Sequence, residues 1–254
     1  HIDIDPVELR RVAKPEVALA ADAKPALAAL IDAVAKVNIR RPSREDELGT
    51  LRAEVKAMFE AKLAPQMAWL EVLRRGLDED GIFVDELTQV GYVARPMFPV
   101  YQPRTFLSSG YQGTLGYGLA TAIGAKVARP EKQVLSIAGD GGLMYNIQEL
   151  ASAVHHRVPI VSVVFADGAF GNVKRMQQEL HGGRVIASDF TNSDFVKLAE
   201  SFGAAGYRAE TPAALETAIA EAFKANVPAL IEVPVGPMPD PWKIIIPGRV
   251  RHAG

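Results

Sequence analysis

The sequence predicts an α/β domain: a doubly wound, mainly parallel sheet with helices on both faces. From Gly81 onward, short runs rich in β-branched and aliphatic residues alternate with stretches of helical periodicity. The middle two of these runs are almost entirely apolar, which is typical of strands buried on both faces of a parallel sheet. The strand candidates are residues 82–84, 134–138, 160–165 and 229–233.

The first residues alternate between apolar and polar side chains. His1 to Asp5 are typical of a strand, and Pro6 ends it. Because a lone strand is unstable, we expect its partners to lie upstream of residue 1, which makes the chain a C-terminal piece of something longer. The alternative is an edge strand of the main sheet. Residues 15–37 are expected to form one helix, with apolar positions at Leu27, Leu30, Ile31 and Val34.

A charged segment that contains proline, residues 40–45, is interpreted as a linker. Ser43 followed by Asp46 indicates the start of a new helix, and a second helix is expected from near Pro65 to about Gly76. Further helices are expected at residues 115–127, 146–155, 194–202 and 212–224, the last with Thr211 as its N-cap and Pro212 in its first position.

Composition excludes several classes of function. A formal net charge of −2 over 254 residues gives no electrostatic field that would attract nucleic acid or an anionic membrane. The absence of cysteine rules out disulfides and thiolate sites. The longest apolar stretch, Val158 to Ala166, is too short to cross a bilayer, and no targeting segment opens the chain. A cytoplasmic location is therefore expected.

The loop after the strand at 134–138 has the composition of a phosphate site. Gly139, Gly141 and Gly142 would let the backbone approach a phosphate closely, at the start of a helix. Asp140 would repel a phosphate unless a divalent cation lay between them, and Mg²⁺ binds both kinds of oxygen. The alternative is an ordinary strand-to-helix turn that Asp140 caps.

The loop after the next apolar strand supports the metal. Asp167 occupies the position equivalent to Asp140, at the end of the following strand. Neighbouring parallel strands lie about 4.8 Å apart, so the two carboxylates could converge on one octahedral ion. The alternative is a common Asp-Gly turn formed by Asp167 and Gly168.

These two loops together resemble the signature of thiamine-diphosphate enzymes, which begins Gly-Asp-Gly and ends Asn-Asn. Here Gly139-Asp140-Gly141 begins it and Ala166-Asp167 ends it, with residues 142–165 between them. Residues 110–118 resemble the family's Gly-rich segment. Within the family, the chain is most similar to acetolactate synthase (acetohydroxyacid synthase large subunit)-like proteins. The resemblance implies that residues 1–40 are the end of a central domain with its linker, and that residues 41–254 are the C-terminal diphosphate-binding domain.

The resemblance assigns roles to particular residues. Asp140 and Asp167 would bind Mg²⁺ through their side chains, and Ala169 through its backbone carbonyl. Gly141 and Gly142 would donate N–H groups to the diphosphate. The remaining cofactor contacts would come from Gly139, from the apolar wedge Leu115 and from the carbonyl of Gly113, which would accept a hydrogen bond from the aminopyrimidine.

The sequence departs from the family pattern in three places. Ala166 and Asp167 replace the two asparagines; Asp167 keeps an oxygen for the metal and adds a charge. Residues 89–93 stand where acetolactate synthases place Gln-His against the diphosphate. The activating glutamate belongs to the family's N-terminal domain, which no segment here resembles, so no catalytic residue is expected in this chain. We therefore expect the isolated chain to be inactive.

The predicted function is that of a thiamine-diphosphate- and Mg²⁺-dependent enzyme acting on 2-oxo acids, with acetolactate-synthase-like carboligation after decarboxylation. A non-oxidative decarboxylase or lyase of the same family and a non-catalytic relative are the alternatives. A nucleotide-binding domain is disfavoured because the first loop lacks Gly-x-Gly-x-x-Gly. The resemblance also implies a homodimer or homotetramer with active sites at a subunit interface. It leaves open whether FAD is bound.

Overall fold

The computed structural model describes residues 1–37, 41–110 and 112–246, and these divide into two compact units. The units are His1–Arg52 and Ala53–Gly254, so the division falls later than the predicted boundary at residue 40. Arg40, in the predicted linker, lies outside the described residues, as does Tyr111 of the Gly-rich segment. The assignment of the first unit to a central domain stays a prediction.

The first unit contains a small parallel sheet. Strand β1 (Ile2–Asp3) pairs with β2 (Leu19–Ala20), so β1 has a partner within the chain, whereas the expectation of partners upstream of residue 1 stays a prediction. Alternation revealed the strand at Ile2, but a two-residue partner is too short to show a period. The helix expected at 15–37 begins later, because β2 occupies part of that range. The other elements are η1 (Glu8–Arg10), α1 (Ala23–Val37) and the start of α2 (Glu45–Lys62).

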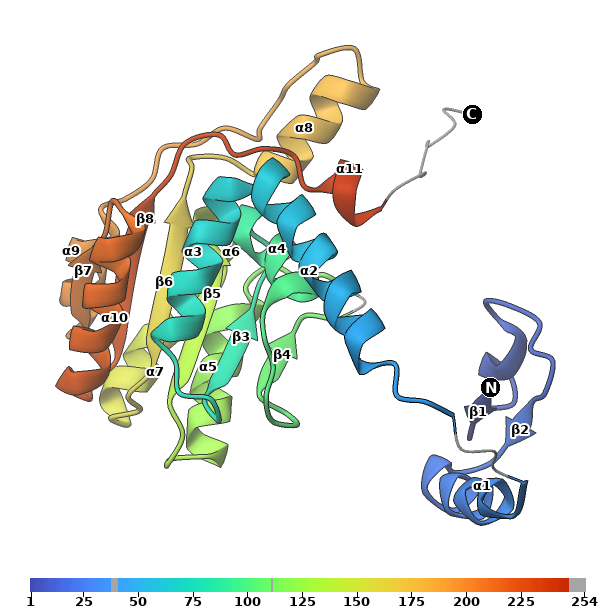
Figure 1. Ribbon diagram of the computed structural model, residues 1–254. Helices are drawn as coiled ribbons and strands as arrows, with labels where there is room; N and C mark the ends of the chain where they lie inside the picture. Colours follow the sequence, from blue (N-terminus) through green and yellow to red (C-terminus); the bar gives the residue numbers. More distant parts are fainter. Residues whose placement is uncertain (38–40, 111, 247–254) are drawn as a thin grey trace. The chain divides into compact units, whose positions relative to one another are not determined.

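The second unit is built on one sheet of six strands (Figure 1). Their order is β4-β3-β5-β6-β8-β7, and every neighbouring pair is parallel. This arrangement confirms the predicted α/β fold with a parallel sheet. The strands are β3 (Ile82–Asp85), β4 (Phe106–Ser108), β5 (Val134–Gly139), β6 (Val161–Ala166), β7 (Ala205–Arg208) and β8 (Ala229–Pro234).

Helices cover both faces of this sheet. On one face α3 and α10 pack together, and on the other α5, α7 and α9 follow the strands (Figure 1). The helices of the second unit, after the shared α2, are α3 (Ala64–Arg75), α4 (Gln89–Met97), α5 (Tyr117–Ala128), α6 (Asp140–Leu143), α7 (Glu149–His155), α8 (Gly171–Leu180), α9 (Phe195–Phe202), α10 (Pro212–Ala225) and α11 (Trp242–Ile245).

Successive residues of each central strand enter the two hydrophobic cores alternately. In β3, Phe83 packs into the core beneath α3 and α10, whereas Ile82 and Val84 pack into the core beneath α5 and α7. In β6, Val163 packs into the core beneath α3 and α10 and Val164 into the core beneath α5 and α7, and both are at most 1% exposed. Burial on both faces is the physical reason why these strands read as continuous apolar runs.

Helix capping follows the predicted signals. The Thr211 hydroxyl accepts a hydrogen bond from the N–H of Ala214 at 3.2 Å, and the Ser43 hydroxyl accepts one from Glu45 at 3.2 Å. Sequence periodicity did not predict β4, β7, α4 or α8. The two strands are short edge strands, and Gly206 interrupts β7.

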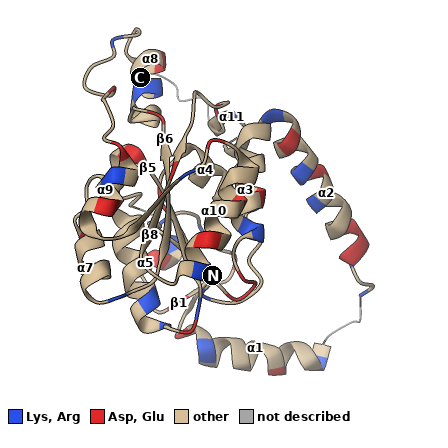
Figure 2. Ribbon diagram, turned by 90° about the vertical axis from the view of Figure 1, so that its left-hand side faces the viewer, with Lys and Arg blue, Asp and Glu red and all other residues tan. Residues whose placement is uncertain are grey.

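Basic and acidic residues are interspersed along the helices (Figure 2), in keeping with the small net charge. Among the residues that the structure describes, no helix combines the length and the apolar character needed to cross a membrane.

Candidate functional site

The two carboxylates singled out from the sequence lie at the ends of the two central strands. Asp140 follows β5 and Asp167 follows β6, and the register of the two strands places Gly139 opposite Phe165. Ligands bind at this edge in open parallel sheets. A pocket of about 270 Å³ opens there. All eight predicted site residues line it: Gly113, Leu115, Gly139, Asp140, Gly141, Gly142, Asp167 and Ala169.

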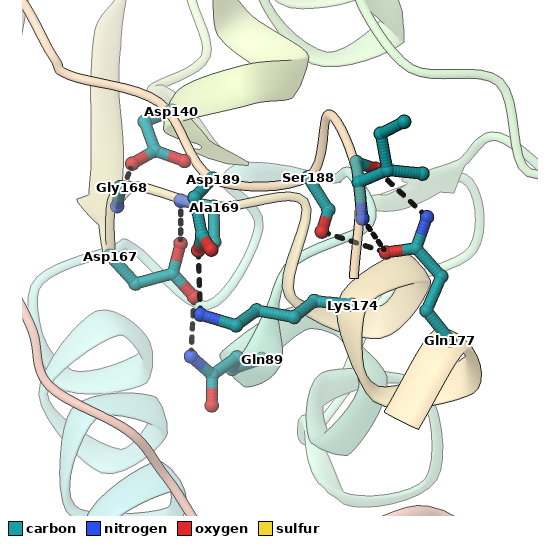
Figure 3. Close-up of polar contacts among 10 residues, drawn as sticks. Gln89, Asp140, Asp167, Gly168, Ala169, Lys174, Gln177, Ser188 and Asp189 are labelled. Carbon is teal, nitrogen blue, oxygen red and sulfur yellow. Dashed lines mark hydrogen bonds and ion pairs between the residues drawn. The ribbon is translucent and has the colours of Figure 1, made fainter. Parts of the chain in front are cut away.

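Asp140 is held in place by three hydrogen-bond donors. Asp140 is only 1% exposed to solvent. Asp140 Oδ1 accepts a hydrogen bond from the N–H of Gly141 at 2.8 Å. Asp140 Oδ2 accepts two more, from the N–H of Gly168 at 2.7 Å and from Asn192 Nδ2 at 2.6 Å (Figure 3 shows the first). These bonds tie the β5 loop to the β6 loop.

Asp167 is held by a side chain from another element. Gln89, at the start of α4, donates from Nε2 to Asp167 Oδ2 at 2.6 Å, and the N–H of Ala169 donates to Oδ1 at 3.2 Å (Figure 3). Gln89 Oε1 in turn accepts from the N–H of Met238 at 3.1 Å. Burial raises the pKa of Asp167, and the negative charge of Asp140 raises it further. The two carboxylates therefore repel each other within one site.

The segment before α9 supports the β6 loop. Phe170 N–H donates to the carbonyl of Ser188 at 2.8 Å, and Phe190 N–H donates to the carbonyl of Gly168 at 2.9 Å. Lys174 of α8 forms an ion pair with Asp189 at 2.6 Å (Figure 3). These two backbone hydrogen bonds and the ion pair hold in place the loop that carries Asp167 and Ala169, the candidate metal ligands.

The glycines of the β5 loop are required by close packing. A Cβ at Gly141 would lie 2.5 Å from the ring of Phe170, and a Cβ at Gly142 would overlap with Glu86 Oε1. A side chain at either position would therefore require Phe170 or Glu86 to move, and glycine leaves the backbone open where a diphosphate would approach. The loop fits the predicted phosphate site.

The donor set fits Mg²⁺ bound together with a diphosphate. Throughout residues 1–37, 41–110 and 112–246, no three His, Cys, Asp or Glu side chains form a group that could hold a metal. Asp140 and Asp167 provide two carboxylates, and a backbone carbonyl is available at Ala169. Mg²⁺ typically completes its shell with phosphate oxygens and water, so two carboxylates beside a phosphate site are sufficient.

Sequence reasoning missed Asn192 and Glu86, and it noted Gln89 only as part of residues 89–93, not as a partner of Asp167. Gln89 holds Asp167, Asn192 holds Asp140, and Glu86 lies buried behind Gly142. No local pattern marks Asn192. Glu86, however, follows β3 almost as Asp140 follows β5, so a search for carboxylates at all the predicted strand ends would have found it.

Comparisons with known proteins agree with this geometry. Residues 87–233 match the family described as "Thiamine pyrophosphate enzyme, C-terminal TPP binding domain". The chain is 33% identical, over 93% of its length, to a probable acetolactate synthase large subunit of Methanocaldococcus jannaschii, and covers 42% of that protein. It is 31% identical, over 93% of its length, to the corresponding protein of Methanococcus aeolicus, of which it covers 43%.

A solved structure shares the fold. This is the thiamine diphosphate-dependent 4-hydroxybenzoylformate decarboxylase of Rhodococcus jostii RHA1, with a TM-score of 0.73 and 26% sequence identity. The match covers 93% of this chain and 43% of the decarboxylase chain, so the chain spans less than half the length of the relatives it matches. On this evidence the chain belongs to the thiamine pyrophosphate enzymes, is similar to acetolactate synthase large subunits, and contains the family's C-terminal cofactor-binding domain.

Proposed function

We propose that the protein binds thiamine diphosphate through a Mg²⁺ ion held by the side chains of Asp140 and Asp167 and by the carbonyl of Ala169. The observation that supports this most strongly is the pair of carboxylates at adjacent strand ends, in one pocket with a glycine loop. Burial and then the negative charge of Asp140 raise the pKa of Asp167, and a divalent cation would relieve the repulsion between the two carboxylates. The N–H of Gly142 would then face the diphosphate, and the N–H of Gly141, which bonds to Asp140 Oδ1, would exchange that acceptor for a diphosphate oxygen.

The other wall of the pocket suits the organic part of the cofactor. Leu115 and Gly113 line it from the Gly-rich segment. Leu115 provides an apolar contact, and the carbonyl of Gly113 is available as a hydrogen-bond acceptor. When bound, thiamine diphosphate supplies the carbon nucleophile and the electron sink, while the protein orients it and excludes water.

For the reaction, we propose decarboxylation of a 2-oxo acid followed by carboligation, as in the acetolactate synthases that the chain resembles. The alternative is a decarboxylase or lyase that ends at the first step, favoured by the structural similarity to a decarboxylase. Asp140, Asp167 and the glycines of the β5 loop would hold the diphosphate end, so they would serve both reactions equally. Use of FAD would depend on residues outside the cofactor pocket.

We also propose that a second copy of the chain completes the active site. Beside Gly141 lies a second hollow of about 360 Å³ that includes the aromatic rings of Phe170 and Phe190. Met144 and Tyr145, on the same hollow, are 43% and 58% exposed. Exposed apolar side chains that adjoin a binding pocket are typical of an interface.

The cofactor assignment is tested by isothermal titration calorimetry. Thiamine diphosphate should bind in the presence of Mg²⁺ and bind far more weakly when the metal is chelated. NAD⁺ serves as the comparison ligand, because it carries a diphosphate without the thiazolium and pyrimidine rings. Equal affinity for NAD⁺, or binding of thiamine diphosphate that does not depend on Mg²⁺, would contradict the proposal.

A further inference from the structure

A second pair of acidic residues lies behind the pocket, at the end of β3. Asp85 and Glu86 are both 0% exposed. Two adjacent carboxylates without any solvent contact are costly, and such groups persist where they are paired. Each of them reaches toward one end of the Gly-rich segment, residues 110–118, whose described residues Gly113 and Leu115 line the pocket.

Glu86 holds the end of this segment. Its Oε1 accepts a hydrogen bond from the N–H of Gly116 at 2.8 Å, and its Oε2 accepts one from the N–H of Gly118 at 2.6 Å. Gly116 has φ of +81° and its carbonyl accepts from Asn146 Nδ2 at 2.7 Å, so both polar groups of this residue are fixed. A Cβ at Gly116 would lie 2.9 Å from Asn146. The turn that carries Leu115 into the pocket is therefore held on both sides.

Arg95 connects Asp85 to the other end of the Gly-rich segment. Arg95 Nε donates to Asp85 Oδ2 at 3.0 Å, and Arg95 NH2 donates to the hydroxyl of Ser109 at 3.2 Å. Ser109 directly precedes Gly110. The two acidic residues thus anchor the Gly-rich segment before its first glycine and after Leu115.

We propose that Glu86 is a positioning residue that fixes the Gly113–Leu115 wall of the pocket and so determines affinity for the organic end of the cofactor, separately from its diphosphate end. This inference rests on the proposed function. Asp140, Asp167 and the backbone bonds among their loops do not involve the Glu86 carboxylate. Loss of the Glu86 charge should therefore loosen one wall and leave the metal side in place.

The isosteric variant Glu86→Gln separates this role from general stability. A glutamine accepts through one oxygen and presents an NH₂ group where the second N–H donor now points. Losing one hydrogen bond to a charged group is expected to weaken thiamine diphosphate binding about tenfold. The matched control is Glu232→Gln, in which a carboxylate that is 7% exposed and bonded to Arg208 in the same sheet is neutralised away from the pocket.

Two measurements on the 254-residue chain decide the proposal. The first, hydrogen exchange without any ligand, should show faster exchange in peptides that cover residues 110–118 of Glu86→Gln, with residues 134–143 unchanged. The second is calorimetry in Mg²⁺, with thiamine diphosphate and inorganic pyrophosphate as separate probes. Glu86→Gln should lose affinity for thiamine diphosphate and keep its affinity for pyrophosphate, and Glu232→Gln should keep both.

Unchanged exchange at 110–118 would overturn the anchoring role of Glu86. An equal loss of both affinities would show that Glu86 acts through stability alone and would overturn its role in the pocket. If the wild-type chain binds neither probe, the proposed function fails and the cofactor role of Glu86 fails with it. The exchange measurement still decides the anchoring of the segment in that case, so the two failures are distinguishable.

Discussion

The end of β3 and the ends of β5 and β6 both place carboxylates at the same edge of the sheet, but in different surroundings. At β3, Glu86 has its charge met by N–H groups of the chain, and Asp85 is paired with Arg95. At β5 and β6, Asp140 and Asp167 share one pocket, and the charge of the first raises the pKa of the second. Burial and the charge of Glu86 raise the pKa of Asp85 as well, so repulsion alone does not distinguish the two regions. The β3 pair is sealed from solvent and bonded to donors of the chain, whereas the β5–β6 pair lines a pocket that an added cation can enter.

The largest effect is expected at Asp140. Asp140→Asn keeps the size of the side chain and an oxygen for the N–H of Gly168, but it removes the charge. We expect Mg²⁺-dependent thiamine diphosphate affinity to fall by more than about 100-fold, exceeding the usual effect of residues outside the metal shell. Calorimetry measures this. Asp194→Asn, which alters a carboxylate that caps α9, is the control. Near-normal affinity of Asp140→Asn would remove it from the metal site.

Gly91→Ala tests how tightly the β3 end is packed. A Cβ at Gly91 would overlap with the carbonyl oxygen of Glu86 and lie 2.6 Å from Asp85 Oδ1. Overpacking at such a site costs about 2 kcal/mol of unfolding free energy. Gly124→Ala in α5 has no atom within 4 Å of its new Cβ and should stabilise the chain slightly. Urea denaturation compares the two, and equal stabilities would show that the β3 end can relax.

Gln89 connects Asp167 to the C-terminal segment, and its loss should have a smaller effect. Gln89→Met removes the 2.6 Å bond to Asp167 and keeps the volume. Replacing a residue that orients a metal ligand from outside the metal shell typically lowers metal affinity by about tenfold or more. We expect Gln89→Met to lower the affinity for Mg²⁺ about tenfold. Gln133→Met, which removes a bond to the N–H of Asp78 away from the pocket, should change nothing. If both variants bind Mg²⁺ equally well, Asp167 does not need Gln89.

Asp85 should give the chain a distinctive dependence of stability on pH. Burial raises the pKa of Asp85 to about 7, against the opposing effect of Arg95. Between its unfolded pKa near 3.8 and 7, the folded chain holds a proton that the unfolded chain has lost. The stability contributed by this proton is complete below the unfolded pKa and is lost as the pH rises toward 7.

Asp85→Asn removes the titrating group and should remove this loss. The unfolding free energy of the wild type is expected to fall relative to the variant by about 1 kcal/mol per pH unit between about pH 4.5 and 6.5. Urea denaturation at several pH values measures the difference. A difference that stays constant with pH would mean that Asp85 is ionised throughout and that Arg95 compensates its charge fully.

The sequence predicted a structural feature correctly where a local pattern of residues has a single physical cause. Continuous apolar runs located β5 and β6 because both faces of these strands are buried. Carboxylates directly after those strands located Asp140 and Asp167. The edge strand β7 could not be predicted, because Gly206 and partial exposure leave no pattern.

By itself, the sequence determined the parallel α/β fold and placed Asp140 and Asp167 at two strand ends, since periodicity and strand-end motifs depend on neighbours along the chain. Gly113, Leu115 and Ala169 were predicted from the resemblance to the family. The tertiary structure decided what supports those residues. Gln89 of α4 bonds to Asp167 in the pocket, and Glu86, which follows β3, holds Gly116 from behind the pocket. Asn192 reaches Asp140 from 52 positions away. The tertiary structure also paired Ile2 of β1 with Leu19 of β2. Hydrogen bonds between distant segments are set by packing geometry, which leaves no trace in local sequence spacing.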